Sequence, residues 1–271
     1  MPHFRPQPSA SLLNQIWQVI AILVLALSAR AESATQLNQL IYITEDYPPY
    51  NYVEDGQLTG KAVTLLLIAS RLAGSPVHLE NIDVMPWARG YHETLNGKNR
   101  VLFSTSRSPA REQLFKWAGP IADEQIALIA KKSRQLNITS VEQLKGLRFG
   151  VVREDISSQY LEPLTLPSGQ IAQGNNVHSI ARMLQANRID IWPVAPNTAK
   201  VILHKVGLNP DDYEVVAYLK ASSLHFAFSK NVDDALVAKL QAALDELRQS
   251  QPHLFPTSYP DRLPLELPPI R

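Results

Sequence analysis

Strands and helices alternate along the first part of this 271-residue chain, and that alternation constrains its fold more than any other feature. Apolar segments predict strands over residues 40–44, 77–82 and 101–103. Helical patterns lie between them, over 62–73 and 88–95, and each ends close to a glycine. The pattern predicts an α/β fold with a largely parallel sheet, in which ligands bind beyond the carboxyl ends of the strands.

A second α/β unit follows along the chain. Its predicted helices cover residues 140–144, 157–161, 180–186 and 232–248, and its predicted strands cover 148–152, 189–192 and 224–228. In the first unit, the turn at 54–57 predicts a small hairpin. We therefore expect two successive α/β units rather than one.

The N-terminus has the form of a secretory signal. Residues 1–31 contain no acidic side chain, carry Arg5, include an apolar run over 16–27 and end in a small-x-small pattern. We expect a signal peptide over residues 1–31, cleaved near Ala31, and export to the periplasm. The apolar run is shorter than the roughly 20 residues of a spanning helix. An uncleaved anchor and a buried helix are the alternatives.

Composition and missing motifs exclude several classes of function. The chain has 26 Lys and Arg against 25 Asp and Glu, so no overall positive field attracts nucleic acid. It has no cysteine, which excludes disulfides, thiolate metal sites and cysteine nucleophiles. The seven histidines lack the spacing of metal ligands, and no hydrolase, zinc-protease or phosphate-loop motif occurs. We expect a binding protein without metal, cofactor or catalytic activity.

Polar residues gather where the third predicted strand meets the next helix. Ser108 suits an N-cap, and Pro109 suits the first helical position, where no backbone N–H is needed. Arg111 follows, and a guanidinium beside free backbone N–H groups suits a carboxylate. With hydroxyls from Ser104 and Ser106, the stretch predicts an anion site. The alternative is a capped surface helix whose arginine meets water or a glutamate.

Two aromatic residues are expected at the same edge of the sheet. Tyr47 follows the first predicted strand and Trp87 follows the second, so both belong near Arg111. Their rings suit an apolar or cationic ligand body, and packing in the core or at the rim is the alternative. Phe115 and Trp117 are assigned mainly to packing.

Taken together, several segments resemble one protein family. They are Tyr47-Pro48-Pro49-Tyr50, Gly60, Trp87-Ala88-Arg89-Gly90, Ser106-Arg107-Ser108-Pro109-Ala110-Arg111, Phe115-Lys116-Trp117-Ala118-Gly119-Pro120, Gly150-Val151-Val152-Arg153 and Arg188-Ile189-Asp190. In order and spacing they resemble the bacterial extracellular solute-binding proteins of family 3, which include the amino-acid receptors of ABC importers. The resemblance implies a fold like the type II periplasmic binding proteins, with two α/β lobes joined by two hinge crossovers near 128–132 and 222–226. Lobe 1 would comprise residues 32–129 and 225–271, and lobe 2 residues 130–224.

The resemblance also implies roles for single residues. In amino-acid-binding members the arginine of this pattern holds the ligand α-carboxylate, which maps to Arg111 with Ser106 and Ser108. Arg153 is expected to touch the ligand across the cleft or to form a salt bridge with a neighbouring acid. Members that bind amino acids carry an acid shortly after the position of Asp190, and this chain has none there. An unpaired buried ammonium is costly, which leaves four candidate substitutes: Glu45, Asp46, Glu154 and Asp155.

The implied function is capture of a small polar or carboxylate-bearing, amino-acid-like molecule. A monomer would close about its hinge over this ligand and deliver it to the membrane permease of an ABC transporter. One alternative is a ligand-presenting subunit of a membrane sensor protein. Another is a periplasmic cyclic-acid dehydratase on the same fold, with Glu154 or Asp155 as its general acid.

Overall fold

A six-stranded mixed sheet, with strand order β4-β1-β5-β10-β6-β9, runs through the chain in the computed structural model, which describes residues 34–255. The expected signal peptide, residues 1–31, and residues 256–271 lie outside the described part. Strand β1 (Ile41–Thr44) pairs in parallel with β4 (Ile82–Val84) and β5 (Arg100–Ser106). The long strands β6 (Lys116–Lys131) and β10 (Tyr213–Phe228) pair antiparallel, and β9 (Trp192–Val194) pairs antiparallel with β6.

Smaller sheets and helices complete the described chain. The predicted hairpin is confirmed as β2 (Tyr52–Glu54) and β3 (Gln57–Thr59), and β7 (Phe149–Val152) pairs in parallel with β8 (Ile171–Gly174). The helices are α2 (Lys61–Leu72), α3 (Trp87–Asn96), α4 (Pro109–Glu112), α5 (Ile156–Leu161), α6 (Val177–Gln185), α7 (Pro196–Lys205) and α8 (Asp234–Ser250). The expected α/β class is confirmed. None of the described helices is long and apolar enough to cross a membrane.

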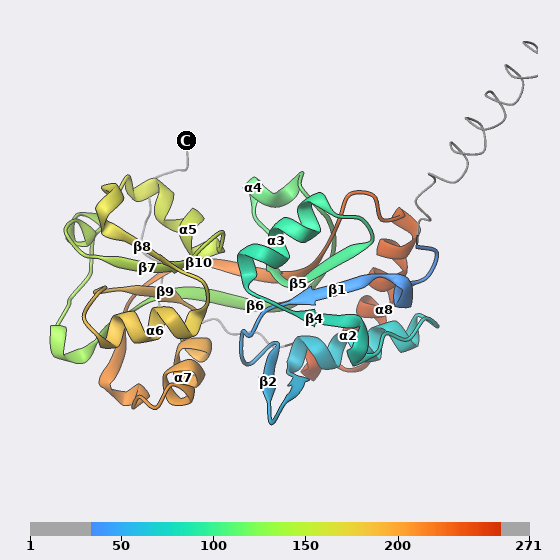
Figure 1. Ribbon diagram of the computed structural model, residues 1–271, viewed down its shortest axis with the longest axis horizontal. Helices are drawn as coiled ribbons and strands as arrows, with labels where there is room; N and C mark the ends of the chain where they lie inside the picture. The colour runs from blue at the N-terminus through green and yellow to red at the C-terminus, as the bar shows by residue number, and fades with distance from the viewer. Residues whose placement is uncertain (1–33, 256–271) are drawn as a thin grey trace, which may run out of the picture. The chain divides into compact units, whose positions relative to one another are not determined.

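The expectation of a largely parallel sheet is wrong because it missed the two long strands. β6 and β10 lie side by side from the pair Lys131 and Tyr213 to the pair Lys116 and Phe228, as Figure 1 shows. Only residues 224–228 of β10 were predicted, and β6 was not predicted at all. The polar residues in the middle of both strands interrupt the apolar pattern on which the prediction relied.

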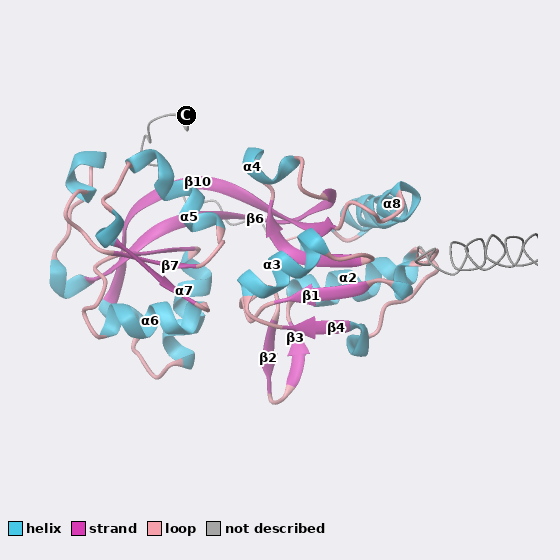
Figure 2. Cartoon of the chain, turned by 45° about the horizontal axis from the view of Figure 1, so that its top comes forward, coloured by secondary structure: helices cyan, strands magenta, loops and turns pink. Residues whose placement is uncertain are grey.

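The long strands separate two groups of elements. β1 to β5 and α2 to α4 precede β6, whereas β7 to β9 and α5 to α7 lie between β6 and β10 in sequence; in Figure 2 they lie toward opposite ends of the two strands. The expected crossovers, near 128–132 and 222–226, fall at the end of β6 and within β10. The lobe boundaries given above remain a prediction.

Local chemistry moves several element boundaries. The predicted strand over 77–82 is wrong for most of its length, because a capping box between His78 and Asn81 forms a 3-10 turn and β4 begins only at Ile82. The predicted strand over 189–192 appears two to three residues later, as β9. β5 continues beyond its predicted end, so Ser104 and Ser106 lie within a strand rather than after it.

Apolar packing fixes the strands that carry the candidate site. On one side of the sheet, Leu65 and Leu66 of α2 and Leu240 and Leu244 of α8 belong to one buried cluster with residues of β1, β5 and β10. A second buried cluster surrounds β7 and includes Phe149, which is fully buried. Burying a Leu or Phe side chain contributes about 1.5–3 kcal/mol each, so these clusters hold the strand ends in place.

Gly60 holds the loop after β1 against α2, and we predict that Gly60→Ala destabilises the protein. Gly60 has φ +121°, and a Cβ there would lie 2.3 Å from the backbone oxygen of Tyr50. The strained backbone and the clash together should lower the free energy of unfolding by about 3 kcal/mol or more, measured by urea denaturation.

The matched control is Gly56→Ala in the β2–β3 turn. Gly56 also has a positive φ, +77°, but no atom lies within 4 Å of its built Cβ. Its replacement should cost only about 1–2 kcal/mol. Equal losses for the two variants would show that the close approach at Gly60 does not constrain the loop.

Candidate ligand-binding site

Arg111 is the buried centre of the candidate site. It lies in α4, immediately after β5, and is only 1% exposed. Its Nη1 donates to the Ser106 carbonyl at 3.2 Å and its Nη2 to the Glu154 carbonyl at 2.6 Å, whereas Nε has no partner. Burial lowers the pKa of Arg111, and the negative charge of Asp155 opposes that shift. An arginine keeps its charge even so, and here it retains N–H groups to offer.

Two aromatic rings flank this guanidinium. Its central carbon lies 5.3 Å from the ring centroid of Trp87 and 5.3 Å from that of Tyr91. Both rings come from α3, where a spacing of four residues places them on the same face. Cation–π attraction of this kind is strongest where water is excluded. Trp87 therefore lies beside Arg111 as predicted, and Tyr91 is a neighbour that the sequence argument missed.

The backbone carbonyl of Glu154 connects the two groups of elements. It accepts a hydrogen bond from Trp87 Nε1 at 2.9 Å as well as the one from Arg111. Glu154 lies between β7 and α5 and has φ +64°, a left-handed conformation that a glutamate rarely adopts. Its side chain is 45% exposed, so the residue contributes its carbonyl rather than its carboxylate.

The three predicted serines are buried, and the hydroxyls of Ser104 and Ser108 bond to protein groups. Ser104 donates to the side-chain oxygen of Asn51, and Ser108 donates to Gln159 Oε1 at 2.8 Å. Ser106 contributes its carbonyl to Arg111. Ser108 occupies the N-cap position with a proline after it, as predicted, but its side chain makes no capping hydrogen bond.

Tyr47 reaches the site from the loop after β1. Its hydroxyl donates to Glu124 Oε2 at 3.3 Å, and its ring stacks on Tyr50 with centroids 5.9 Å apart.

Arg153 behaves differently from the other predicted residues. It is exposed, and its Nε donates to Gln173 Oε1 at 3.3 Å, so neither a place in the site nor a salt bridge is found.

Three carboxyl groups face this region from separate elements. Glu124 of β6 is 2% exposed; burial, and secondly the charge of Asp155, raise its pKa to about 8, against a lowering by the Tyr47 hydrogen bond. Burial also raises the pKa of Glu45 well above its usual value, with the charges of Asp155, Asp46 and Glu124 adding to the effect. Oε2 of Glu45 has no hydrogen-bond partner. Glu45 and Asp155 were considered as ammonium partners from the sequence, whereas Glu124 was missed.

The sequence did contain a signal for Glu124. Residues 121–130 are mostly apolar, and a charged residue within such a run is either exposed or buried for a purpose.

Asp190, by contrast, has a structural role. Its carboxylate accepts hydrogen bonds from Arg148 and lies 2.9 Å from Arg134, which leaves it committed to those two arginines.

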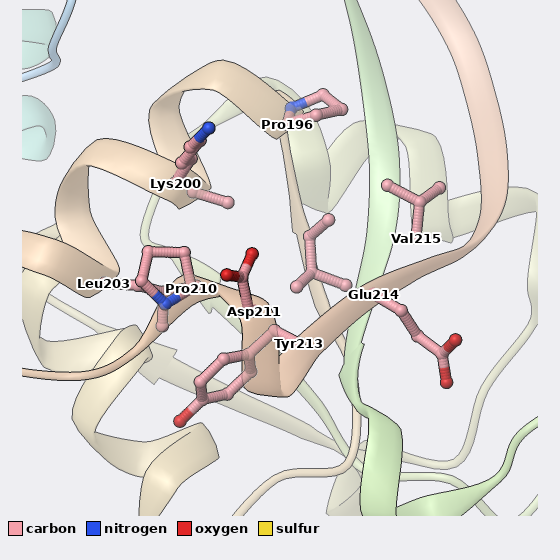
Figure 3. Close-up of a pocket in the computed structure, with 10 residues that line it drawn as sticks. Pro196, Lys200, Leu203, Pro210, Asp211, Tyr213, Glu214 and Val215 are labelled. Atoms are coloured by element: carbon pink, nitrogen blue, oxygen red, sulfur yellow. The ribbon is translucent and has the colours of Figure 1, made fainter.

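A separate cavity lies elsewhere, between α7 and the start of β10 (Figure 3). Its volume is about 170 Å³, and it is lined by residues that include Lys200, Leu203, Asp211 and Tyr213. None of the residues predicted for the ligand site lines it. No group of three or more His, Cys, Asp or Glu residues that suits a metal ion occurs in residues 34–255.

Known proteins share both the sequence pattern and the fold. The family model of the bacterial extracellular solute-binding proteins, family 3, matches residues 40–253. The chain belongs to this family. The resemblance inferred from the motifs is thereby confirmed, and the family is one of solute-binding proteins. No curated protein matches the sequence.

Solved structures with low sequence identity have the same fold. A histidine kinase sensor domain with similarity to periplasmic binding proteins has a TM-score of 0.70 at 21% identity, and the match covers 80% of this chain and 93% of that one. The arginine-bound form of truncated ArgBP from T. maritima gives 0.66 at 17%, over 77% and 96%. An ABC uptake transporter substrate-binding protein from Streptococcus pneumoniae with bound histidine gives 0.67 at 20%, over 79% and 88%.

We predict that Glu124→Gln stabilises the protein at alkaline pH. Because the folded pKa of Glu124 is about 8 and its usual value is 4.5, its carboxyl group favours folding most at low pH, and this contribution is lost as the pH rises from about 4.5 to about 8. The linkage is about 1.4 kcal/mol per pKa unit, and glutamine lacks it. Urea denaturation at pH 5.5 and pH 8.5 should show that the free energy of unfolding of the variant rises relative to that of the parent between the two pH values.

The matched control for this prediction is Glu246→Gln on the exposed side of α8. It should follow the pH dependence of the parent protein at both pH values. A Glu124→Gln variant that also follows the parent would mean that Glu124 is not held protonated by its surroundings.

Proposed function

We propose that this protein captures a small amino-acid-like molecule at the Arg111 site for delivery to an ABC transporter. The observation that carries the proposal is a fully buried guanidinium whose Nε is unpaired, beside carboxyl groups that also lack a complete set of partners. A carboxylate and an ammonium on one small molecule would complement both kinds of group.

Arg111 is the proposed clamp for the ligand carboxylate. A guanidinium has five N–H donors in a planar fork, and two backbone carbonyls receive hydrogen bonds from two of its nitrogens here. Those carbonyls fix the plane of the fork and leave Nε free for an acceptor. Trp87 and Tyr91 shield the charge from water, which strengthens an ion pair formed there.

Contacts between the two groups of elements support closure over the ligand. Besides the bonds to the Glu154 carbonyl, Lys205 Nζ of α7 donates to the Val53 carbonyl of the hairpin at 3.2 Å. His178 of α6 lies 3.7 Å from Asp46 after β1. A hinge motion that opens the site must break such contacts, and a ligand that bridges the two sides favours the closed state.

The proposal places the protein in the periplasm and gives it a membrane permease as partner. Membership of an extracellular solute-binding family supports this location, and neighbours that hold arginine or histidine show that the fold accommodates amino acids. The sensor-domain neighbour supports one alternative, in which the closed form is presented to a membrane sensor. Both versions use the same ligand site and differ only in the protein that recognises it.

We further propose that the ligand is released unchanged. For the dehydratase alternative, the two general-acid candidates are poorly placed: the Glu154 side chain is largely exposed, and Asp155 accepts hydrogen bonds from Ser157 as the N-cap of α5. Incubation of the purified protein with a prephenate-like acid should leave that acid intact. Turnover would contradict the binding function.

The central test is a thermal-shift screen against amino acids, organic acids and amines, repeated with Arg111→Lys. Ligands should raise the melting temperature by an amount that grows with the logarithm of their concentration over Kd. Lysine keeps the charge but loses the planar fork, so we expect binding about 10- to 100-fold weaker. Calorimetric titration gives the affinity, and circular dichroism checks the fold.

Arg107→Lys is the matched control, because Arg107 lies four residues away, is exposed and pairs with Glu112 at 2.6 Å. It should bind as the parent does. If Arg111→Lys also retains the affinity of the parent, Arg111 is not the carboxylate clamp.

A further inference from the structure

The carboxyl groups around Arg111 outnumber the positive charges there. Burial first, and then the charges of acidic neighbours that include Asp155, raise the pKa of both Glu45 and Glu124. In residues 34–255, no basic side chain lies within 4 Å of any of the three carboxylates in an ion pair. Like charges that share a buried site do not all ionise without a compensating cation.

Unpartnered atoms show independently that this region is built to hold a molecule. Arg111 is 1% exposed and its Nε has no partner, although its charge is near enough to oppose in part the increase in the pKa of Glu45 that burial and acidic neighbours cause. Oε2 of Glu45 likewise has none. Buried polar atoms are almost always hydrogen-bonded in native proteins, so two such atoms of opposite charge in one region point to an amphoteric ligand.

We propose that Glu124 pairs with a positively charged group of the ligand and, with Glu45 and Asp155, makes the site select molecules with a net positive charge. The inference rests on the proposed function and assigns its ligand class: one carboxylate and two cationic nitrogens. Glu124 thereby replaces the acid that this chain lacks after Asp190.

Counting charges favours this class over simple zwitterions. Burial and mutual repulsion favour the protonated forms of Glu45 and Glu124 in the absence of ligand. A zwitterion pairs its carboxylate with Arg111 and brings one cation to the carboxyl groups. A ligand with two cationic nitrogens brings a second cation, so that a further carboxyl can ionise and form a buried ion pair. The additional ion pair becomes a difference in affinity.

The position of Glu124 also fits this role. Tyr47 fixes one carboxylate oxygen, Oε2, by its hydrogen bond, and Glu124 lies opposite Ser222 where β6 and β10 cross between the two groups of elements. Tyr47 and Tyr50 stack beside it and add ring faces that attract cations.

Binding of a cation should then release a proton from Glu124. The pKa of this carboxyl, about 8 without ligand, falls when a positive charge lies beside it. Affinity for the cation therefore rises with pH up to about 8, by at most tenfold per pH unit, and levels off above that. The charged or titratable groups that face Glu124 and its neighbours include Glu45, Asp46, Tyr47 and Tyr50 after β1, Tyr91 in α3, Arg111 in α4, and Asp155 and Tyr160 around α5.

The test is calorimetric titration of the full chain with L-arginine and with L-citrulline, its neutral isostere. We expect the parent protein to bind arginine at least tenfold more tightly than citrulline at pH 7. Titrations in buffers of different ionisation enthalpy should show proton release on binding arginine. Glu124→Gln should remove most of the preference and the proton release, whereas Glu246→Gln should keep both.

The outcomes separate this inference from the proposed function. Equal affinity of the parent for the two probes, or a Glu124→Gln variant that keeps the arginine preference and the proton release, would overturn the inference and leave an amino-acid-binding protein. If the parent protein bound neither probe and no compound of the ligand screen, the proposed function itself would be contradicted. Circular dichroism of the variants confirms that the comparison is between folded proteins.

Discussion

The antiparallel pairing of β6 with β10 is the constraint on which the rest of the structure depends. The ladder joins residues about 80 to 110 positions apart in sequence and extends through both groups of elements. Through it β5 is joined to β9 in one sheet. The middle of the ladder is also the only stretch of β6 where polar residues replace buried apolar ones on both faces, and Glu124 lies there. Burying a carboxyl group in a strand costs free energy of folding, and contact with a ligand can offset this cost in the bound state.

The geometry couples the shape of the site to its charges. Arg111 is held by two carbonyls, one from Ser106 at the end of β5 and one from the loop at Glu154, so the fork is oriented only when the two groups of elements are close together. The same approach places Asp155 near Glu124 and Glu45, where its charge adds to the effect of burial in raising their pKa values. On the proposed function, closing the site would concentrate these carboxyl groups, and a cationic ligand would relieve their repulsion. In this account, ligand selection and closure depend on the same carboxyl groups.

Much of the fold and part of the site followed from sequence. The strand–helix alternation gave the α/β class, and the ordered motifs indicated the family. Trp87, Arg111 and Tyr47 lie in one region because each follows a strand of the same sheet, which local patterns do reveal. The pairing of β6 with β10 was not predicted, because polar residues interrupt the alternation of apolar residues in both strands. Glu124 was missed for the same reason, since its burial depends on residues far away in the chain. Arg153 also follows a strand, but it is exposed and donates to Gln173, because position after a strand does not determine where a side chain points.

The most direct test of this account is a crystal structure of the protein with L-arginine bound. The account predicts the ligand carboxylate within hydrogen-bond distance of Arg111 Nε and a ligand nitrogen within that distance of the Glu124 carboxylate. A ligand bound with no nitrogen near Glu124, or bound away from Arg111, would contradict the assignment of these two residues as the opposite poles of the site.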